Sequence, residues 1–301
     1  MPATKHGNQK QRLPFYRCSG SQVRTTRHLT RLFKKFFNIS SKRLRPQSHS
    51  GRLGNLGQTY KNYFMKIISW NCCMAFRKKM GPILKKKPDL LIIQECEPLD
   101  KFDFDSFSKK PTSQHWCGYK DGKKGVAIFS FGKYSFRVHD LYSEDFSIVV
   151  PIILSDGSEE YNIIAVWTLD TKVKGGHYVD QIWRAIDYYD SHITTSRTIL
   201  IGDFNSNVIF DKKTKESSHG NMVIKLAKKG IVSAYHEKHK QKQGTERHPT
   251  FYLYRHQDKP YHLDHCFISG DMLSRLKKVE IGKYDDWSAL SDHSPLTITF
   301  S

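Results

Sequence analysis

The sequence lacks several features that would define its class at once. It has no uninterrupted run of about 18 apolar residues, so it does not predict a transmembrane helix. Its first residues contain no apolar segment of the kind found in secretory signal peptides. Its six cysteines include no Cys-x-x-Cys pair, so their spacing does not predict a zinc site. We therefore expect buried free thiols in a reducing compartment, a cytoplasmic location and no membrane partner. The sequence does not define the oligomeric state.

Acidic residues are absent from the first 64 positions, which contain 14 Lys or Arg residues. The rest of the chain holds the other 35 of the 49 basic residues together with all 29 acidic ones, a net charge of +6. Residues 1–64 have too few apolar positions to bury a core. We therefore predict a basic, disordered extension over residues 1–64 and a folded domain over residues 65–301.

Three interpretations of the basic extension stay open. It is a solvated tail, with Met65 as the true start of the protein, because the first predicted strand begins at the next residue. It is an electrostatic arm that binds nucleic acid. It is an organelle transit peptide, since such peptides are rich in Arg and Ser and poor in acids.

Residues 65–301 combine strands with helices, which favours an α/β domain with mixed sheets. Helices are predicted where apolar residues recur with a helical period, and strands where short apolar runs end in polar or turn residues. The predicted helices are 76–87, 178–192 and 222–229. The predicted strands are 66–71, 90–94, 126–130, 147–154, 161–168, 198–201, 250–254, 263–268 and 296–300, with 147–154 and 161–168 forming a hairpin.

Polar residues follow or interrupt many of these strands. Strand ends are where binding sites collect in α/β sheets. Carboxylates and amides suit a hard cation such as Mg²⁺, and a His–Asp pair suits the hydrolysis of a phosphate ester. The residues concerned are Asn71, Glu95, Asp203, Asn205, Asp264, Asp292 and His293.

Six short segments resemble, in the same order, the motifs of the endonuclease/exonuclease/phosphatase superfamily, which includes apurinic endonucleases and pancreatic deoxyribonuclease. The resemblance implies a four-layer sandwich of two mixed β-sheets flanked by helices. It also implies Mg²⁺- or Mn²⁺-dependent hydrolysis of phosphodiester bonds, with nucleic acid as the leading substrate. The segments are Ile68-Ser69-Trp70-Asn71, Ile93-Gln94-Glu95, Gly125-Val126-Ala127-Ile128, Gly202-Asp203-Phe204-Asn205, Leu263-Asp264 and Ser291-Asp292-His293.

Two alternative functions stay open beside a nuclease. The same superfamily contains phosphatases and phosphodiesterases that act on small-molecule, lipid or inositol phosphates, and fold alone does not decide between them. The chain could also bind nucleic acid with impaired catalysis.

The resemblance assigns metal and water chemistry to three carboxylates. Glu95 would bind the Mg²⁺ ion, and Asp292 would help to bind it. Asp203 would orient or deprotonate the water that attacks the phosphorus atom in line with the leaving oxygen.

The resemblance assigns four further residues to the phosphate. Asn71 and Asn205 would hold phosphate oxygens and neighbouring carboxylates. His293 would contact the phosphate and stabilise its growing negative charge. Asp264 would fix His293 and favour its charged form.

One position departs from the family pattern. Family members usually carry a His or Tyr where the best alignment places Trp167. An indole N–H donates one hydrogen bond but cannot protonate a leaving group. The nearby His177 could substitute, although a residue at this place more often caps or flanks the following helix. We expect Trp167, Thr250 and Tyr252 to contact the substrate.

Basic and aromatic residues accompany these motifs. Lys85–Lys87 and Lys123–Lys124 would surround a cleft and attract phosphates, or lie on a solvated face. His248, Tyr252, Tyr254, Arg255 and Tyr261 would stack bases or bind phosphates, or pack on a strand face.

Overall fold

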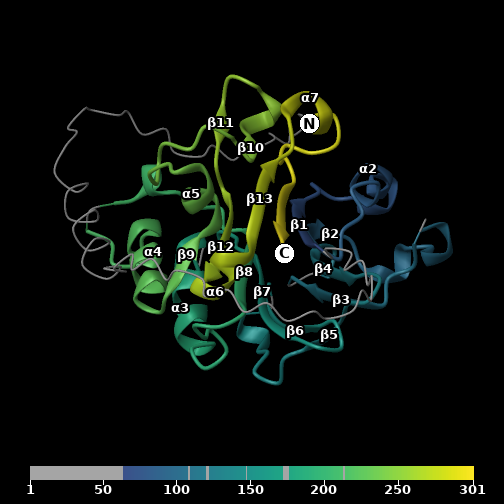
Figure 1. The fold of residues 1–301 in the computed structure, drawn as a ribbon. Coiled ribbons are helices and arrows are strands. Elements are labelled where there is room, and N and C mark those ends of the chain that lie inside the picture. The colour runs from purple at the N-terminus through teal and green to yellow at the C-terminus, as the bar shows by residue number, and fades with distance from the viewer. Residues whose placement is uncertain (1–63, 108, 120–121, 147, 172–175, 213) are drawn as a thin grey trace, which may run out of the picture. The chain divides into compact units, whose positions relative to one another are not determined.

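The computed structural model describes residues 64–301 except 108, 120–121, 147, 172–175 and 213. The predicted extension over residues 1–64 thus lies outside the described residues, apart from Phe64. The described part contains two six-stranded mixed sheets with flanking helices, which confirms the predicted fold class (Figure 1). Among these residues, no helix combines the length and the apolar character that a membrane crossing requires.

The first sheet contains the strand that ends at Asn71. β1 pairs in parallel with β2, and every other pair in this sheet is antiparallel. The strands lie in the order β13 (Leu276–Ile281), β14 (Leu296–Phe300), β1 (Met65–Asn71), β2 (Leu90–Cys96), β4 (Gly125–Ser130) and β3 (Ser113–Gly118).

The second sheet contains the strands that carry Asp203 and Asp264. The predicted hairpin is confirmed as antiparallel β6 and β7, and β7 then pairs in parallel with β8. The strands lie in the order β5 (Ser135–Val138), β6 (Val149–Ser155), β7 (Glu160–Trp167), β8 (Thr198–Asp203), β12 (Asp264–Ser269) and β9 (Ile231–Ser233). A separate two-stranded ribbon joins β10 (Phe251–Tyr252) to β11 (Pro260–Tyr261).

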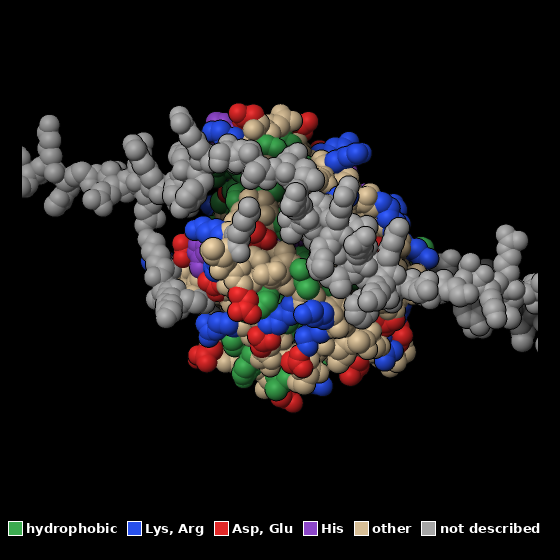
Figure 2. Space-filling model, turned by 90° about the vertical axis from the view of Figure 1, so that its left-hand side faces the viewer, with side chains coloured by type: hydrophobic (Ala, Val, Ile, Leu, Met, Phe, Trp, Pro, Cys, Tyr) green, Lys and Arg blue, Asp and Glu red, His purple; other side chains and the backbone are tan. Residues whose placement is uncertain are grey.

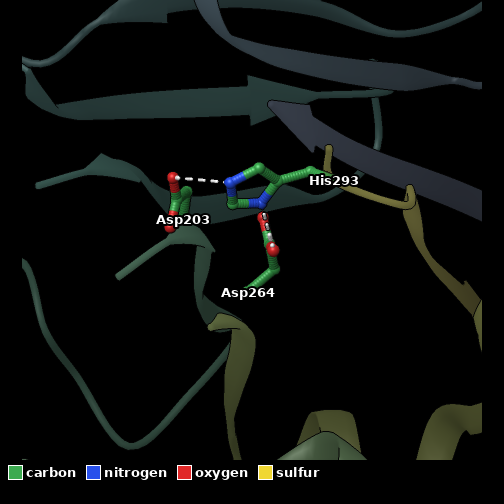
Figure 3. A group of neighbouring side chains, drawn as sticks. All are labelled: Asp203, Asp264 and His293. Carbon is green, nitrogen blue, oxygen red and sulfur yellow. Dashed lines mark hydrogen bonds and ion pairs between the residues drawn. The ribbon is translucent and has the colours of Figure 1, made fainter. Parts of the chain in front are cut away.

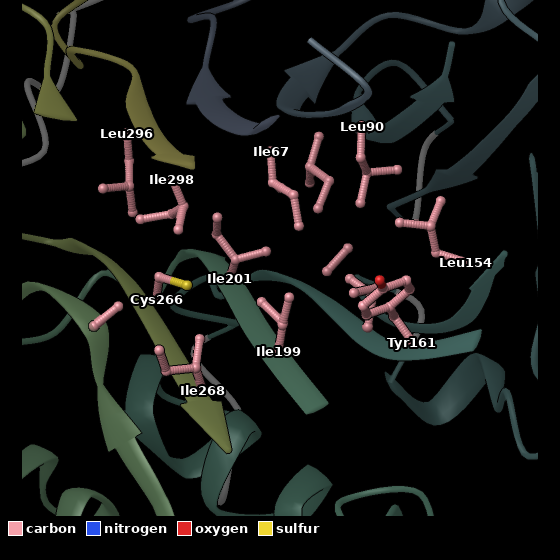
Figure 4. Close-up of a cluster of buried hydrophobic side chains, with 14 of the residues drawn as sticks. Ile67, Leu90, Leu154, Tyr161, Ile199, Ile201, Cys266, Ile268, Leu296 and Ile298 are labelled. Carbon is pink, nitrogen blue, oxygen red and sulfur yellow. The ribbon is translucent and has the colours of Figure 1, made fainter. Parts of the chain in front are cut away.

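The two large sheets pack face to face over one apolar core (Figure 4). Ile67 and Leu90 point into this core from the first sheet, and Ile199, Ile201 and Ile268 point into it from the second. All five side chains are fully buried. Burial of an aliphatic side chain of this size contributes about 1.5–3 kcal/mol, so the core holds the strand ends of the two sheets in fixed positions.

Helices cover the outer faces of both sheets. α3 (Tyr178–Tyr188) and α4 (His219–Lys228) pack their apolar residues against the second sheet. α2 (Met80–Leu84) and α7 (Tyr284–Trp287) do the same on the first. Figure 2 views the side on which α4 lies, and basic and acidic side chains are intermixed on its coloured part. The remaining helical segments are α5 (Ala234–His239), α6 (Gly270–Arg275) and the 3-10 turns η1 (Phe76–Lys78), η2 (Leu99–Lys101), η3 (Phe104–Ser106), η4 (Glu144–Phe146), η5 (Val208–Phe210) and η6 (Leu253–Arg255).

Three predicted elements are shorter than the sequence pattern indicated. The helix over 178–192 ends at Tyr188, because the backbone leaves the helical region at Tyr189. The helix over 76–87 is two pieces, η1 and α2, because the backbone leaves the helical region at Lys79. The strand over 250–254 pairs only at Phe251–Tyr252, because Tyr254 and Arg255 both adopt left-handed φ angles. The resulting 3-10 turn leaves the Tyr254 side chain 68% exposed.

The cysteines of the described part behave as free thiols. Cys72, Cys96, Cys117 and Cys266 are buried, and Cys73 is half-buried. This agrees with the expectation of buried free thiols. Cys18 lies outside the described residues.

Candidate active site

Strand register places the first two site carboxylates side by side. Asp203 ends β8, and its antiparallel partner on β12 is Asp264. The parallel partner of Asp203 on β7 is Trp167. Gly202 permits this close pairing, because a Cβ atom there would lie 1.8 Å from the Val166 carbonyl oxygen. The sheet therefore presents Trp167, Asp203 and Asp264 as neighbours across three strands.

Three hydrogen bonds orient the Asp203 carboxylate, which is fully buried. Its Oδ2 atom accepts from Asn71 Nδ2 at 3.0 Å and from Asn205 Nδ2 at 2.9 Å. Its Oδ1 atom accepts from the Asn205 backbone N–H at 2.9 Å. Asn205 adopts a left-handed φ of 46°, a conformation that Asn tolerates better than most residues. Asn71 belongs to the first sheet, so its amide connects the two sheets at the site.

His293 lies between the two carboxylates (Figure 3). Its Nδ1 atom is 2.9 Å from Asp264 Oδ2, and its Nε2 atom is 3.8 Å from Asp203 Oδ2. The His293 backbone is fixed as well, because its carbonyl accepts from Trp70 Nε1 at 2.9 Å and its N–H donates to Ser291 Oγ at 3.1 Å. The imidazole therefore has a fixed orientation, with Nδ1 bound to Asp264.

The charges of the two carboxylates favour a protonated imidazole. Burial by itself would lower the pKa of His293, but the negative charges of Asp264 and Asp203 outweigh it and raise this pKa. Burial raises the pKa of the Asp203 carboxyl, although the positive charge of His293 opposes that shift. The site thus favours an imidazolium at His293 beside a carboxyl group that gains a proton more readily than usual.

Glu95 joins the site through the Asn71 amide. It lies where the pairing of β2 with β4 shifts register, and its φ is a left-handed 54°. Such a bulge redirects a side chain, and it is common beside active sites. Asn71 Nδ2 donates to Glu95 Oε1 at 3.3 Å, and Lys124 Nζ lies 3.2 Å from Glu95 Oε2. The amide of Asn71 therefore connects Glu95 to Asp203.

Asp292 lies next to His293 in the chain and is only partly buried. Its carboxylate accepts a long hydrogen bond of 3.4 Å from Ser291 Oγ. Its backbone carbonyl accepts from the Tyr252 N–H at 2.8 Å. The structure thus brings Asn71, Asp203, Asn205, Asp264 and His293 together, links Glu95 to them, and places Asp292 beside them.

The three residues expected to contact the substrate are buried in this structure. Thr250 and Trp167 are fully buried, and Tyr252 is 8% exposed. Thr250 Oγ1 accepts the backbone N–H groups of Leu263 and Asp264, each at 2.9 Å. In this structure Thr250 therefore positions Asp264, Tyr252 supports the Asp292 backbone, and Trp167 packs in the core between the sheets.

Some supporting residues have no clear signal in the sequence. Ser291 donates its hydroxyl to the Asn71 carbonyl at 2.7 Å, and the Phe251 ring lies 4.7 Å from the His293 ring. Ser291 was part of the Ser-Asp-His segment, and Phe251 was part of a predicted strand. Neither pattern indicated these contacts, because they join residues that are distant in the chain.

His177 was considered above as a substitute for the His or Tyr that family members carry at the position of Trp167. Its Nδ1 atom lies 3.4 Å from Asp170 Oδ1.

The donor atoms of the site fit a divalent cation. One ligand atom each from Asp203, Asp264 and His293 lies within 4.8 Å of the others, so this buried group could bind a metal ion once the His293 imidazole has lost a proton. Asp264 Oδ1 is buried and has no hydrogen-bond partner in the described part of the chain, which leaves one carboxylate oxygen for a cation or a water. The adjacent Glu95 adds a partly exposed carboxylate. This oxygen-rich set suits a hard ion such as Mg²⁺.

Comparisons with known proteins agree with the fold and the motifs. Residues 68–293 match the model of the Endonuclease/Exonuclease/phosphatase family. No curated protein sequence gives a significant match. An AP endonuclease from Archaeoglobus fulgidus is 21% identical, with a TM-score of 0.60 over 79% of this chain and 99% of that one. The 3'-5' exonuclease NExo from Neisseria meningitidis is 22% identical, with a TM-score of 0.59 over 79% of this chain and 100% of that one.

A third solved structure is the endonuclease domain of TRAS1, a telomere-specific non-LTR retrotransposon. It is 18% identical, with a TM-score of 0.55 over 79% of this chain and 98% of that one. At these identities the likeness to the solved structures establishes the fold.

Proposed function

Because the chain belongs to the endonuclease/exonuclease/phosphatase family, we propose that it is a Mg²⁺-dependent nuclease that hydrolyses phosphodiester bonds of nucleic acid. The observation that carries this proposal is the position of His293 between Asp264 and Asp203. A carboxylate, an oriented imidazole and a second carboxylate in one buried cluster are the groups needed to activate water and stabilise charge on a phosphate.

The proposed roles follow from the contacts of each side chain. Asp203, oriented by Asn71 and Asn205, accepts a proton from the attacking water. The Nδ1–H group of His293 donates a hydrogen bond to Asp264. The Nε2–H group is then available to donate to a phosphate oxygen. Imidazolium charge at this position stabilises the negative charge that grows on that oxygen.

Glu95 and Asp292 are the residues that we propose to hold the Mg²⁺ ion. When bound, such an ion supplies positive charge that polarises a phosphate oxygen and helps to orient the substrate. Oxygen donors from two carboxylates, completed by water, are the usual way in which proteins bind Mg²⁺.

A row of aromatic rings favours nucleic acid over a small phosphoester. Phe251 lies 4.7 Å from His293, Tyr261 lies 6.3 Å from Phe251, and Phe210 lies 5.5 Å from Tyr261. Phe210 is 54% exposed, as is its neighbour Ile209. Aromatic side chains that line a path from a phosphate site bind bases by stacking, whatever the base. The row therefore offers a base a stacking surface beside the proposed phosphate position.

The test is hydrolysis by the full chain, with Mg²⁺ and with EDTA, beside Glu95→Gln and His293→Ala. The panel contains plasmid DNA, single-stranded RNA, an abasic duplex and a generic small phosphodiester. We expect Mg²⁺-dependent cleavage of a nucleic acid that both substitutions abolish. Cleavage of the small diester alone would contradict the nuclease proposal, and so would nucleic-acid cleavage that survives His293→Ala.

The aromatic row has its own test. Phe210→Ala removes the exposed end of the row, and Tyr188→Ala removes an aromatic ring that is 50% exposed on α3. We expect Phe210→Ala to raise the KM for nucleic acid by roughly 10-fold, as the loss of one stacked base predicts. Its turnover of the small diester should stay unchanged, and Tyr188→Ala should change neither. Equal effects of the two substitutions would contradict base stacking on Phe210.

A further inference from the structure

Lys124 occupies a fixed position at the edge of the site. It directly precedes β4, and its backbone carbonyl accepts the Tyr119 N–H at 2.9 Å, which closes the turn between β3 and β4. Its side chain is 35% exposed. Lys124 is therefore neither a freely solvated surface lysine nor a buried one.

The ammonium group of Lys124 makes two contacts with site residues. Its Nζ atom is 3.2 Å from Glu95 Oε2 and 5.2 Å from the centroid of the Trp167 ring. Among the described residues, this is the one Lys or Arg ion pair formed by a carboxylate of the candidate site. A carboxylate and an aromatic face together hold a cation more firmly than either does alone. The positive charge is thus directed at the site.

Trp167 explains why a cation at this place matters. Trp167 is the register partner of Asp203, and its Nε1 atom is buried without a hydrogen-bond partner in the described part of the chain. Because this atom is shielded from solvent, the indole N–H is not exposed to a substrate in this structure. A charged donor does lie over this ring: the Lys124 ammonium, which can bind a phosphate oxygen as a point charge.

We propose that Lys124 anchors the substrate by binding a non-bridging oxygen of the phosphate, and that Glu95 and Trp167 hold its ammonium ready in the absence of substrate. This inference rests on the proposed function, because it requires a phosphodiester at His293. It makes Lys124 a binding residue that supplies the positive charge that the indole of Trp167 lacks.

The shared carboxylate gives the proposal a second consequence. The Lys124 ammonium and a divalent cation are both attracted to the Glu95 carboxylate, and their positive charges repel each other. Removal of the ammonium should strengthen metal binding while it weakens substrate binding. If Lys124 only kept the Glu95 side chain in position, its removal would instead weaken metal binding. The change in metal affinity therefore distinguishes the two roles.

The experiment compares Lys124→Met and Lys124→Arg with Lys228→Met in the full chain. Lys228→Met removes the same charge from an exposed position at the end of α4. Mn²⁺ binding is measured by electron paramagnetic resonance without substrate, and KM and kcat are measured on a nucleic acid that the unaltered protein cleaves. Circular dichroism establishes that each variant is folded.

We expect Lys124→Met to lower the Kd for Mn²⁺ by several-fold and to raise the KM by about 10-fold, the loss expected for one hydrogen bond to a charged group. Lys124→Arg should restore the KM, because a guanidinium also binds phosphate. Lys228→Met should match the unaltered protein in both measurements.

The outcomes separate this proposal from the proposed function. An active protein in which Lys124→Met changes neither Mn²⁺ affinity nor KM would overturn the lysine proposal alone. Weaker Mn²⁺ binding by Lys124→Met would overturn it as well, and would make the lysine a support for Glu95. An unaltered protein that cleaves no substrate of the panel would overturn both proposals.

Discussion

The Nδ1 atom of His293 lies 2.9 Å from the Oδ2 atom of Asp264, although the two residues are 29 positions apart. The backbone N–H of Asp264 donates to Thr250 Oγ1 at the start of β12, which fixes the position of Asp264. His293 is held from the other side, through the hydrogen bond between Trp70 Nε1 and its carbonyl. The pair is therefore built by residues from both sheets.

Asp264→Asn should remove the negative charge of Asp264 but keep the size of its side chain. An amide oxygen can still accept the Nδ1 proton, but it carries no negative charge to raise the pKa of His293. We expect this pKa to fall and kcat to drop by about 100-fold or more, the range found when a base loses its orienting carboxylate. Titration of the His293 ring by nuclear magnetic resonance measures the first effect. An unchanged titration would show that Asp264 does not control the charge.

Removal of the metal should lower thermal stability if the site binds Mg²⁺. A ligand that binds only the folded state stabilises it in proportion to the logarithm of its concentration, by about 2.7 kcal/mol at 100 times its Kd. We expect Mg²⁺ to raise the Tm of the unaltered protein, EDTA to reverse the effect, and Glu95→Gln to abolish it. If Mg²⁺ raises the Tm of Glu95→Gln as well, then the buried group of Asp203, Asp264 and His293 is the one that holds the ion.

Gly202→Ala should be strongly destabilising, because its Cβ atom would meet the Val166 carbonyl oxygen at 1.8 Å. Relief of that clash requires β7 and β8 to move apart beside Asp203. We expect a loss of more than about 2 kcal/mol in the free energy of unfolding. Gly81→Ala is the matched control, since no heavy atom lies within 4 Å of its added Cβ atom. Urea denaturation measures both, and equal stabilities would refute the close approach.

Acid should destabilise the protein through its buried histidines. Burial lowers the pKa of His219 to about 3, and His219 Nδ1 is 2.9 Å from Ser206 Oγ. The unfolded chain takes up this proton near pH 6.5, whereas the folded protein does not. This group therefore does not lower the free energy of unfolding above about pH 6.5. Below that pH the free energy of unfolding decreases by about 1.4 kcal/mol per pH unit for this group.

The matching experiment is urea denaturation at pH 7 and pH 5. We expect His219→Gln to lose about 2 kcal/mol less than the unaltered protein does between these values, since glutamine does not titrate. His256→Gln, which replaces an exposed histidine, should leave the difference unchanged. A His219→Gln protein with the same pH dependence as the unaltered one would contradict the prediction.

Much of the fold follows from local sequence patterns. β1, β4, β8 and β14 were predicted within two residues of their bounds, because each is a short apolar run with a polar or turn residue at its end. β13 and β3 were missed, because lysines and half-buried polar residues break up their apolar pattern. The strand at 250–254 was predicted too long, because left-handed φ angles at Tyr254 and Arg255 carry no signal in residue type.

The sequence by itself determined the family motifs and the residue types of the site. Order along the chain is enough for that, since each motif lies in or close to a recognisable strand. The tertiary structure alone decided that Asp203 and Asp264 are register partners and that Thr250 and Trp167 are fully buried. It also decided that Lys124 lies against Glu95, 29 residues away. Such contacts depend on which distant strands pair and on how the two sheets pack, and a local pattern carries no information about either.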